Sequence, residues 1–199
     1  MKTPTWEDLE ARNAAATRFE LSGSLYVAGH VDTGPVDDHF LFWFGRGNRW
    51  WVERNGSAVY ASASSTGAAP VARINGHMVH QRTDSVIRLG KLFTPSDLFG
   101  PRSLLTRRTK SQHSASTPEP TSYQGRQGWS VTLTSSTGPT TVLTIDDRTG
   151  LITTLNSVDH EQSLRLDDLV EHHDLPDSRF EWHGSTIERN ESPDFKMTW

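Results

Sequence analysis

The chain has 199 residues, a formal net charge of -4 and no cysteine. This length suits one domain with a sizeable core, and the absence of cysteine excludes disulfides, thiolate metal sites and cysteine nucleophiles. The small negative charge gives no general attraction to nucleic acid or anionic membranes. Apolar runs as short as FLFWF cannot span a bilayer, so no transmembrane segment is expected.

Residues 4–18 form the first expected element, an amphipathic helix. Thr3 or Thr5 can cap its start, and Pro4 suits its first turn. Trp6 and Leu9 lie on an apolar side at roughly helical spacing. The N-terminal stretch MKTPTWEDLEARNAAA lacks the apolar core of a signal peptide. A cytoplasmic protein is therefore expected from the sequence as written, and an extracytoplasmic one if the chain is a trimmed mature form.

Strand patterns begin at Phe19 and continue beyond residue 80. Apolar and polar residues alternate from Phe19 to Val27, which is typical of a half-buried strand. FLFWF and RWWVERN flank GRGN, which predicts a hairpin with a short turn. VARINGHMVHQR predicts two more strands joined at Asn75-Gly76, because Asn and Gly tolerate the positive φ of a type I′ turn.

The middle of the chain has a different pattern from its two flanks. TPSDLFGPRSLLTRR predicts one or two short helices, a helical insert over residues 95–106 that is interrupted at Gly100-Pro101. Strand patterns return in GWSVTLTSS and in TTVLTI and LITTLNSV, which flank the turn DDRTG. SLRLDDLVEHHDL predicts a last long strand, with a bend at Asp167-Asp168.

This order of elements predicts an α+β fold. Strands joined by tight turns pair antiparallel, so we expect one curved antiparallel sheet, a half-barrel of about 9–11 strands. The N-terminal helix and the helical insert would pack on its concave face. Residues 1–183 would form this single domain, and residues 184–199 a polar C-terminal tail.

Histidine and aspartate pairs do not have the spacing of a metal site or of a catalytic site. His77 and His80 point to opposite faces of a strand, and the adjacent His172 and His173 also face apart. The paired aspartates of PVDDH and IDDRTG do not match a calcium loop. No serine-nucleophile, phosphate-loop or dinucleotide motif is present. We therefore predict no catalytic residue, no metal and no cofactor.

The stretch RSLLTRRTK at residues 102–110 carries four basic side chains. It could contact phosphate or an acidic partner. A solvated helix end explains the same pattern, and the acidic chain lacks an aromatic RNA-binding motif. Nucleic acid is therefore not expected as a partner.

The aromatic stretch FLFWFGRGNRWWVERNG has apolar residues on both faces. Phe40, Phe42 and Phe44 share one face of the first strand, whereas Leu41 and Trp43 share the other. A strand that is apolar on both sides must be covered on both sides. The second cover could be a helix, the insert, a partner or a ligand, so the stretch is either core on both faces or the wall of an apolar cavity.

The segment VLTIDDRTGLITTLNSVD contains a D-x-x-T-G-L turn, and the residues from Leu175 to Phe180 have the pattern Leu-Pro-Asp-x-x-Phe. In these two motifs and in the order of its elements, the chain resembles the LolA-like lipoprotein carriers, the mycobacterial lipid-binding lipoproteins and the RseB-type sigma-factor regulators. The resemblance implies a half-barrel over residues 5–183, with an apolar cavity between sheet and helices. No individual site residue follows from it.

The first functional hypothesis is a non-catalytic binding module for a lipid, an acyl chain or another apolar ligand between sheet and helices. Burial of about 0.8 kcal/mol per CH2 would retain such a ligand. The candidate ligand-binding residues are wall residues on strands and lid residues in the insert. They are Leu25, Phe42, Trp43, Trp51, Val131, Leu133 and Leu143 for the wall, and Leu98, Phe99, Leu104 and Leu105 for the lid.

Two alternatives stay open from the sequence. The first is a protein-interaction or regulatory module of the same fold with a filled core, which would contact its partner through exposed aromatics such as Trp51 and Trp199 or through the basic insert. The second is an enzyme with dispersed acid and base residues, which a cleft lined by carboxylates or by histidine and a carboxylate would favour.

Overall fold

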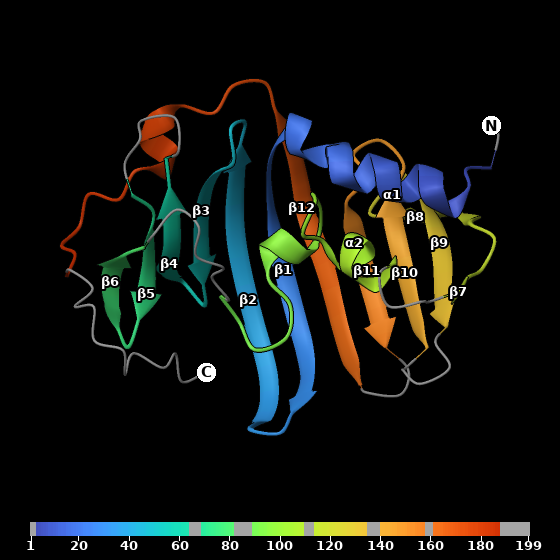
Figure 1. Cartoon of the computed structure of the whole chain (residues 1–199), viewed down its shortest axis with the longest axis horizontal. Coiled ribbons are helices and arrows are strands. Elements are labelled where there is room, and N and C mark those ends of the chain that lie inside the picture. Colours follow the sequence, from blue (N-terminus) through green and yellow to red (C-terminus); the bar gives the residue numbers. More distant parts are fainter. Residues whose placement is uncertain are drawn as a thin grey trace.

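The computed structural model describes residues 3–63, 69–81, 89–109, 114–134, 140–157 and 161–187. Figure 1 shows that they form one curved sheet with helices packed against it. The sheet has 12 strands, so the predicted α+β fold with a curved antiparallel sheet is confirmed and the expected strand number is slightly low. The strands are β1 (Glu20–Val31), β2 (Gly34–Gly45), β3 (Arg49–Arg54), β4 (Ser57–Ser62), β5 (Val71–Ile74), β6 (His77–His80), β7 (Ser114–Ala115), β8 (Glu119–Tyr123), β9 (Arg126–Thr134), β10 (Thr141–Asp146), β11 (Ile152–Ser157) and β12 (Gln162–His172).

The chain builds the sheet outward from its centre. Strands β2 to β6 follow one another on one side of β1, and β12, β11, β10 and β9 lie on its other side, with β7 and β8 paired to β9. The first strand of the chain therefore lies beside the last one. The predicted hairpin at Asn75 and Gly76 joins β5 to β6, and both residues have positive φ, at 49° and 85°.

The predicted bend in the last strand is a β-bulge. Asp168 has a φ of 52°, and the register between β1 and β12 shifts between Ser22, which faces Val170, and Ser24, which faces Asp167. One extra residue on β12 is accommodated there, which bends the strand.

Helix α1 (Trp6–Ala15) continues as the 3-10 turn η1 (Ala16–Arg18), close to the predicted range. The hydroxyl of Thr5 accepts from the Asp8 N–H at 3.2 Å, and the Asp8 carboxylate accepts from the Thr5 N–H at 2.9 Å. This capping box satisfies two backbone donors at the helix start. Leu9 and Asn13 are buried toward the sheet.

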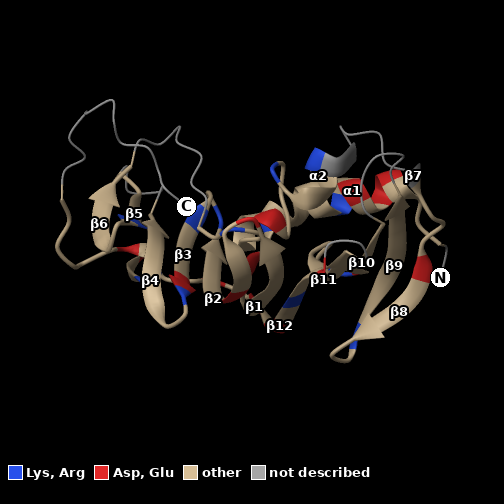
Figure 2. Ribbon diagram, turned by 90° about the horizontal axis from the view of Figure 1, so that it is seen from below, with Lys and Arg blue, Asp and Glu red and all other residues tan. Residues whose placement is uncertain are grey.

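One face of the sheet carries the main core, and it is the concave face. Leu25 of β1, Phe42 of β2 and Val131 of β9 are buried there with α1 and with the helical insert, which contains the 3-10 turn η3 (Pro95–Asp97) and α2 (Leu104–Thr109). Figure 2 shows α1 and α2 on the same side of the sheet. The predicted packing of the N-terminal helix and the insert on the concave face is confirmed.

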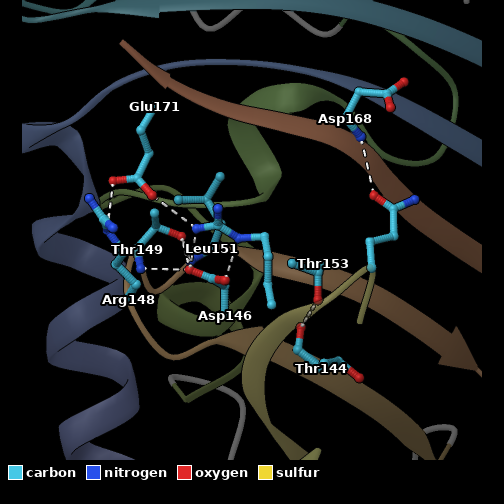
Figure 3. Close-up of polar contacts among 10 residues, drawn as sticks. Thr144, Asp146, Arg148, Thr149, Leu151, Thr153, Asp168 and Glu171 are labelled. Carbon is cyan, nitrogen blue, oxygen red and sulfur yellow. Dashed lines mark hydrogen bonds and ion pairs between the residues drawn. The ribbon is translucent and has the colours of Figure 1, made fainter. Parts of the chain in front are cut away.

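The D-x-x-T-G-L turn between β10 and β11 is closed by its own aspartate (Figure 3). Asp146 accepts hydrogen bonds from the Thr149 N–H at 2.7 Å and from its hydroxyl at 2.6 Å. Arg126 reaches Asp146 at 2.7 Å and Glu171 at 3.0 Å. Burial by itself would raise the pKa of Asp146, but hydrogen bonds from Arg126 and Thr149 outweigh it and hold the pKa below its usual value.

The glycine of this turn fixes α1 against the sheet. Gly150 has a φ of +76°, and a Cβ there would lie 2.7 Å from the backbone carbon of Arg12. The side-chain amide of buried Asn13 donates to the carbonyls of Gly150 at 2.7 Å and of Leu98 at 2.8 Å. The D-x-x-T-G-L turn therefore has a structural role, because it lies against α1 and is linked through Asn13 to the insert.

The opposite, convex face is covered in part by residues 174–187, which we call the C-terminal strap. The strap leaves the end of β12 and runs to the strands β3 to β6 (orange to red in Figure 1). It contains the 3-10 turn η4 (Asp177–Phe180) and ends where Ile187 donates to the Met78 carbonyl of β6 at 3.0 Å. Residues 184–187, which we expected to begin a polar tail, thus contact the sheet, whereas residues 188–199 lie outside the described residues.

Candidate functional site

The eleven predicted ligand-binding residues, of the wall and the lid together, divide between the two faces of the sheet. Nine of them lie in the one core cluster of the concave face and are buried, with exposures no greater than the 7% of Leu104. These nine are Leu25, Phe42, Leu98, Phe99, Leu104, Leu105, Val131, Leu133 and Leu143. That they bind a ligand stays a prediction.

One lid residue of that prediction, Phe99, packs directly on aromatic side chains of the sheet. The ring of Phe99 lies 4.9 Å from the ring of Phe44 and 5.6 Å from that of Trp50, and Phe44 and Trp50 are 4.7 Å apart. Such centroid distances are those of aromatic pairs in contact. Side chains of the insert and of the sheet therefore meet in this part of the concave face.

Trp43 and Trp51 do not join that cluster. They face each other across β2 and β3 on the convex face, because successive side chains of a strand alternate. The sequence left open whether the N-terminal helix, the insert or a gap lies over them. The strap packs there instead, because Trp43 and Trp51 pack against the small cluster that contains Leu175 and Phe180 of the strap. Trp199, the other aromatic considered for a contact surface, lies outside the described residues.

A cation holds the strap against these tryptophans. The guanidinium carbon of Arg179 lies 3.5 Å from the ring centroid of Trp43 and 5.9 Å from that of Trp51. Burial lowers the pKa of Arg179, and the nearby charge of Glu53 opposes this. Glu53 also accepts from the indole N–H of Trp51 at 2.9 Å. The arrangement is a cation–π contact in a partly desolvated setting, where such contacts are strongest.

A second cation fixes the start of the strap. Arg49 pairs with the buried Glu20 at 2.9 Å and with Asp177, and it donates to the Leu175 carbonyl at 3.3 Å. Glu20 accepts in turn from the Leu175 N–H at 2.6 Å. The Arg49 guanidinium also lies 4.7 Å from the Phe180 ring. Three segments distant in sequence are thereby joined at one buried ion pair.

A pocket of about 310 Å³ lies between the strap and the strands β4 to β6. Its floor is formed by small side chains of the convex face, Ala61, Ala63 and Val71, and by Ala69. These side chains fill little of the space under the strap, which explains the hollow. The remaining lining residues are His80 of β6 and the strap residues Phe180, Glu181, Trp182, His183, Gly184 and Thr186.

A polar contact to β6 and an aromatic contact to β3 hold the strap near the pocket. The His80 Nε2 lies 3.0 Å from the Thr186 hydroxyl, and the rings of Trp51 and Trp182 are stacked 6.2 Å apart. The floor and the rings are apolar, and His80, Thr186 and Glu181 add polar groups. A pocket with this lining suits a compact, largely apolar group with one polar end.

The histidines and basic residues that were considered from the sequence lie in different parts of the fold. His80 lines the pocket while His77 is exposed. Arg107 of the basic stretch pairs with Asp97. Burial raises the pKa of Asp97, and the positive charge of Arg107 limits that rise. Lys110 and His113 lie outside the described residues. Within the described ranges, no three His, Asp or Glu side chains are placed to hold a metal ion, and no helix is long and apolar enough to cross a membrane.

Sequence reasoning missed the strap side of the pocket. The Leu-Pro-Asp-x-x-Phe pattern contains Leu175 and Phe180, but nothing local indicates that it crosses to the convex face. The available signal was two small residues, Ala61 of β4 opposite Trp51 and Ala63 just after the strand, because a large ring beside small side chains leaves a hollow.

No protein-family profile matches the sequence, and no curated protein matches it. Several solved structures are similar in shape. MucB from the Pseudomonas aeruginosa MucA/MucB complex has 13% identity and a TM-score of 0.46, with 89% of this chain and 60% of that chain covered. A LolA superfamily protein from Nitrosomonas europaea has 8% identity and a TM-score of 0.33, with 90% and 98% covered.

A DUF1329 family protein from Desulfovibrio piger has 11% identity and a TM-score of 0.33, with 90% of this chain and 98% of that chain covered. LolA-like and RseB-type proteins, to which the sequence pattern is similar, are thus represented among these structures. The chain spans about three fifths of the length of the MucB chains that it matches.

Proposed function

We propose that this chain is a non-catalytic binding module that holds a compact, largely apolar group in the pocket between the strap and β4 to β6. The observation that carries the proposal is the pocket itself, of about 310 Å³. This volume is near the lower limit of the volumes of ligand-binding pockets. An aromatic or branched side chain or a short acyl chain is a group of the right kind.

The packing of the concave face supports this location over the space between sheet and helices. Phe99 of the insert is in ring contact with Phe44 and Trp50, so a ligand there must first separate a packed core. Protein interiors tolerate such insertion poorly. A group that enters under the strap meets the alanine floor and needs no change in the concave core.

Filling the pocket tests the proposal. Ala69 lines the pocket and is exposed, so Ala69→Leu adds bulk with little disturbance of the core. The exposed Ala28 of β1 does not line it, so Ala28→Leu is the matched control. Anilinonaphthalene sulfonate and N-acetyl-tryptophan amide serve as probes, with fluorescence titration for affinity and amide-resolved NMR for location.

We expect both probes to shift the amide signals of Ala61, Val71 and His80 in the unmodified chain. Ala69→Leu should weaken binding by about tenfold or more, equal to about 1.4 kcal/mol, while Ala28→Leu leaves it unchanged. Binding that is equal in the two variants, or shifts confined to residues of the concave core, would overturn the proposal. Native mass spectrometry of freshly purified protein identifies any ligand that is already bound.

A further inference from the structure

We propose that the group entering the pocket is a side chain of an extended peptide, which pairs as an added strand with the outer edge of β6. This inference rests on the proposed function, because it names the partner of the same pocket. Three features carry it: the direction of the β6 backbone groups, the strand contact that the chain itself makes there, and the position of the pocket beside that edge.

The outer edge of β6 presents backbone groups for pairing. Among the described strands, β6 is the last in the sheet order, and β5 and β6 are joined by a two-residue turn, with Ile74 opposite His77. In such a hairpin the residues flanking the turn bond to each other, and the direction of the backbone groups alternates from there. His77 and Val79 therefore bond toward β5, whereas Met78 and His80 direct their N–H and C=O outward.

The chain already uses this edge for a strand contact. Ile187 of the strap forms a parallel bridge with Val79, and its N–H donates to the outward Met78 carbonyl at 3.0 Å. Its side chain is 50% exposed, so the bridge buries little apolar surface. A short contact with little burial is weakly held, which makes this edge accessible to a competing strand.

The pocket lies where such a strand would need it. His80 lines the pocket from β6, and Thr186, which contacts His80, precedes the bridging Ile187. Side chains of an added strand alternate between the two faces of the sheet. Every second side chain of the peptide then lies on the face that carries His80 and Val71, where one apolar side chain can reach the pocket. Backbone pairing with a side-chain pocket is an established mode of peptide recognition.

At the opposite end of the sheet, where β7 and β8 both pair with β9, β8 is built against such pairing. In the β8–β9 hairpin, Tyr123 pairs with Arg126 across the turn, so Pro120 and Ser122 direct their backbone groups outward. Proline has no N–H to donate, and it is a common means of blocking an edge strand. β6 has no proline between His77 and His80, so the two edges differ in their capacity to accept a strand.

A five-residue peptide tests the inference with the full chain. The probe is acetyl-Thr-Ser-Trp-Ser-Thr-amide, compared with N-acetyl-tryptophan amide, which has the same side chain without the strand. A third probe carries N-methyl groups on alternate backbone nitrogens and lacks those donors. Decanoate is the acyl competitor. Affinity is measured by calorimetry, and the amide signals of Met78 and His80 are followed by NMR.

We expect the peptide to bind at least tenfold more tightly than N-acetyl-tryptophan amide and to shift the signals of Met78 and His80. N-methylation should remove that gain. Ile187→Pro removes the N–H that bonds Met78, so it should raise peptide affinity several-fold and leave the affinity for N-acetyl-tryptophan amide unchanged. Ala69→Leu should weaken the binding of both by about tenfold or more.

The outcomes separate this inference from the proposed function. If N-acetyl-tryptophan amide binds in the pocket but the peptide gains nothing, the strand is refuted and the pocket function stands. If decanoate binds there more tightly than the peptide, a lipid is the ligand and the peptide is refuted. If no probe binds in the pocket, the proposed function fails and the peptide inference fails with it.

Discussion

The two faces of the sheet are covered by different physical means. On the concave face, α1 and the helical insert bury apolar side chains in one continuous cluster that includes Leu25, Phe42 and Phe99. On the convex face, the strap buries only a small apolar cluster and is also held by two arginines: Arg179, which lies over Trp43, and Arg49, which pairs with Glu20. Apolar burial is additive and non-directional, whereas a guanidinium contact needs one geometry. The concave cover therefore stabilises the fold, and the convex cover shapes a pocket.

The sizes of the clusters agree with this division. The convex clusters are small, with Ala61, Val71 and Met78 in one and Ala63, Leu175 and Phe180 in the other. Regions with fewer buried apolar contacts open at lower free-energy cost than the main core. The strap, with the pocket beneath it, can thus rearrange without unfolding the sheet.

The largest expected effect comes from neighbouring aromatic residues that face opposite sides. Phe44 is 1% exposed in the concave core, so Phe44→Ala should lower the free energy of unfolding by about 3–5 kcal/mol. Trp43 is half-buried under the strap, so Trp43→Ala should cost about 2 kcal/mol. Urea unfolding measures both. Equal losses of unfolding free energy would show that the concave and convex covers contribute equally to stability.

The buried ion pair at the base of the strap comes next. Arg49→Met leaves the Glu20 carboxylate buried without its partner, and removing one member of such a pair costs about 3 kcal/mol or more. The double variant Arg49→Met with Glu20→Gln removes the charge but keeps an oxygen for the Leu175 N–H, so it should be more stable than Arg49→Met alone. Chemical denaturation of both proteins checks the order, and the reverse order contradicts a charge-based role.

Substitutions at two glycines with positive φ separate the free-energy cost of turn strain from the cost of disturbing the packing of α1. Gly150→Ala introduces both the strain of a left-handed conformation and a clash with the Arg12 backbone, so we expect a loss of about 2–4 kcal/mol. Gly76 also has positive φ, at +85°, but a Cβ there would meet no atom of the described residues within 4 Å. Gly76→Ala should therefore cost only about 1 kcal/mol. The difference, measured by thermal or urea unfolding, reports the contact between the turn and α1.

A smaller effect is expected at the cation over the tryptophans. Arg179→Ala should weaken strap docking by about 1–2 kcal/mol, because the contact is partly desolvated. Its matched control is Arg18→Ala, since Arg18 is exposed and lies 4.8 Å from the Phe19 ring. Hydrogen exchange should quicken for strap amides in Arg179→Ala and stay unchanged in Arg18→Ala. Equal exchange in both variants would show that the Arg179 cation does not contribute to strap docking.

The smallest effect concerns acid stability through Asp146. Its folded pKa is lowered, so its contribution to stability is present above the unfolded pKa and is lost as pH falls through the folded pKa. Asp146→Asn should therefore lose less stability than the unmodified chain between about pH 5 and about pH 2. Asp97 acts in the opposite direction, because burial raises its pKa. Urea unfolding across this pH range checks the sign.

Much of the concave half was predictable from the sequence. Period-two patterns placed the strands, and the Asn75-Gly76 pair placed the hairpin between β5 and β6. The D-x-x-T-G-L turn and the face assignment of Phe42 against Trp43 also follow from local patterns. The convex half was not predictable, because the strap residue Arg179 meets Trp43 and Trp51 only after the chain has crossed the sheet.

By itself, the sequence determined the period of each strand, the positions of the tight turns and the face on which each aromatic residue lies. Those properties depend on steric limits within a few residues. Only the tertiary structure decided that the strap, and neither helix, covers Trp43 and Trp51. It also placed the pocket over Ala61 and Val71, beside the outer edge of β6. Glu20, Arg49 and Leu175 are far apart in the sequence, and only tertiary packing brings them into contact. A local sequence pattern therefore cannot predict that they are partners.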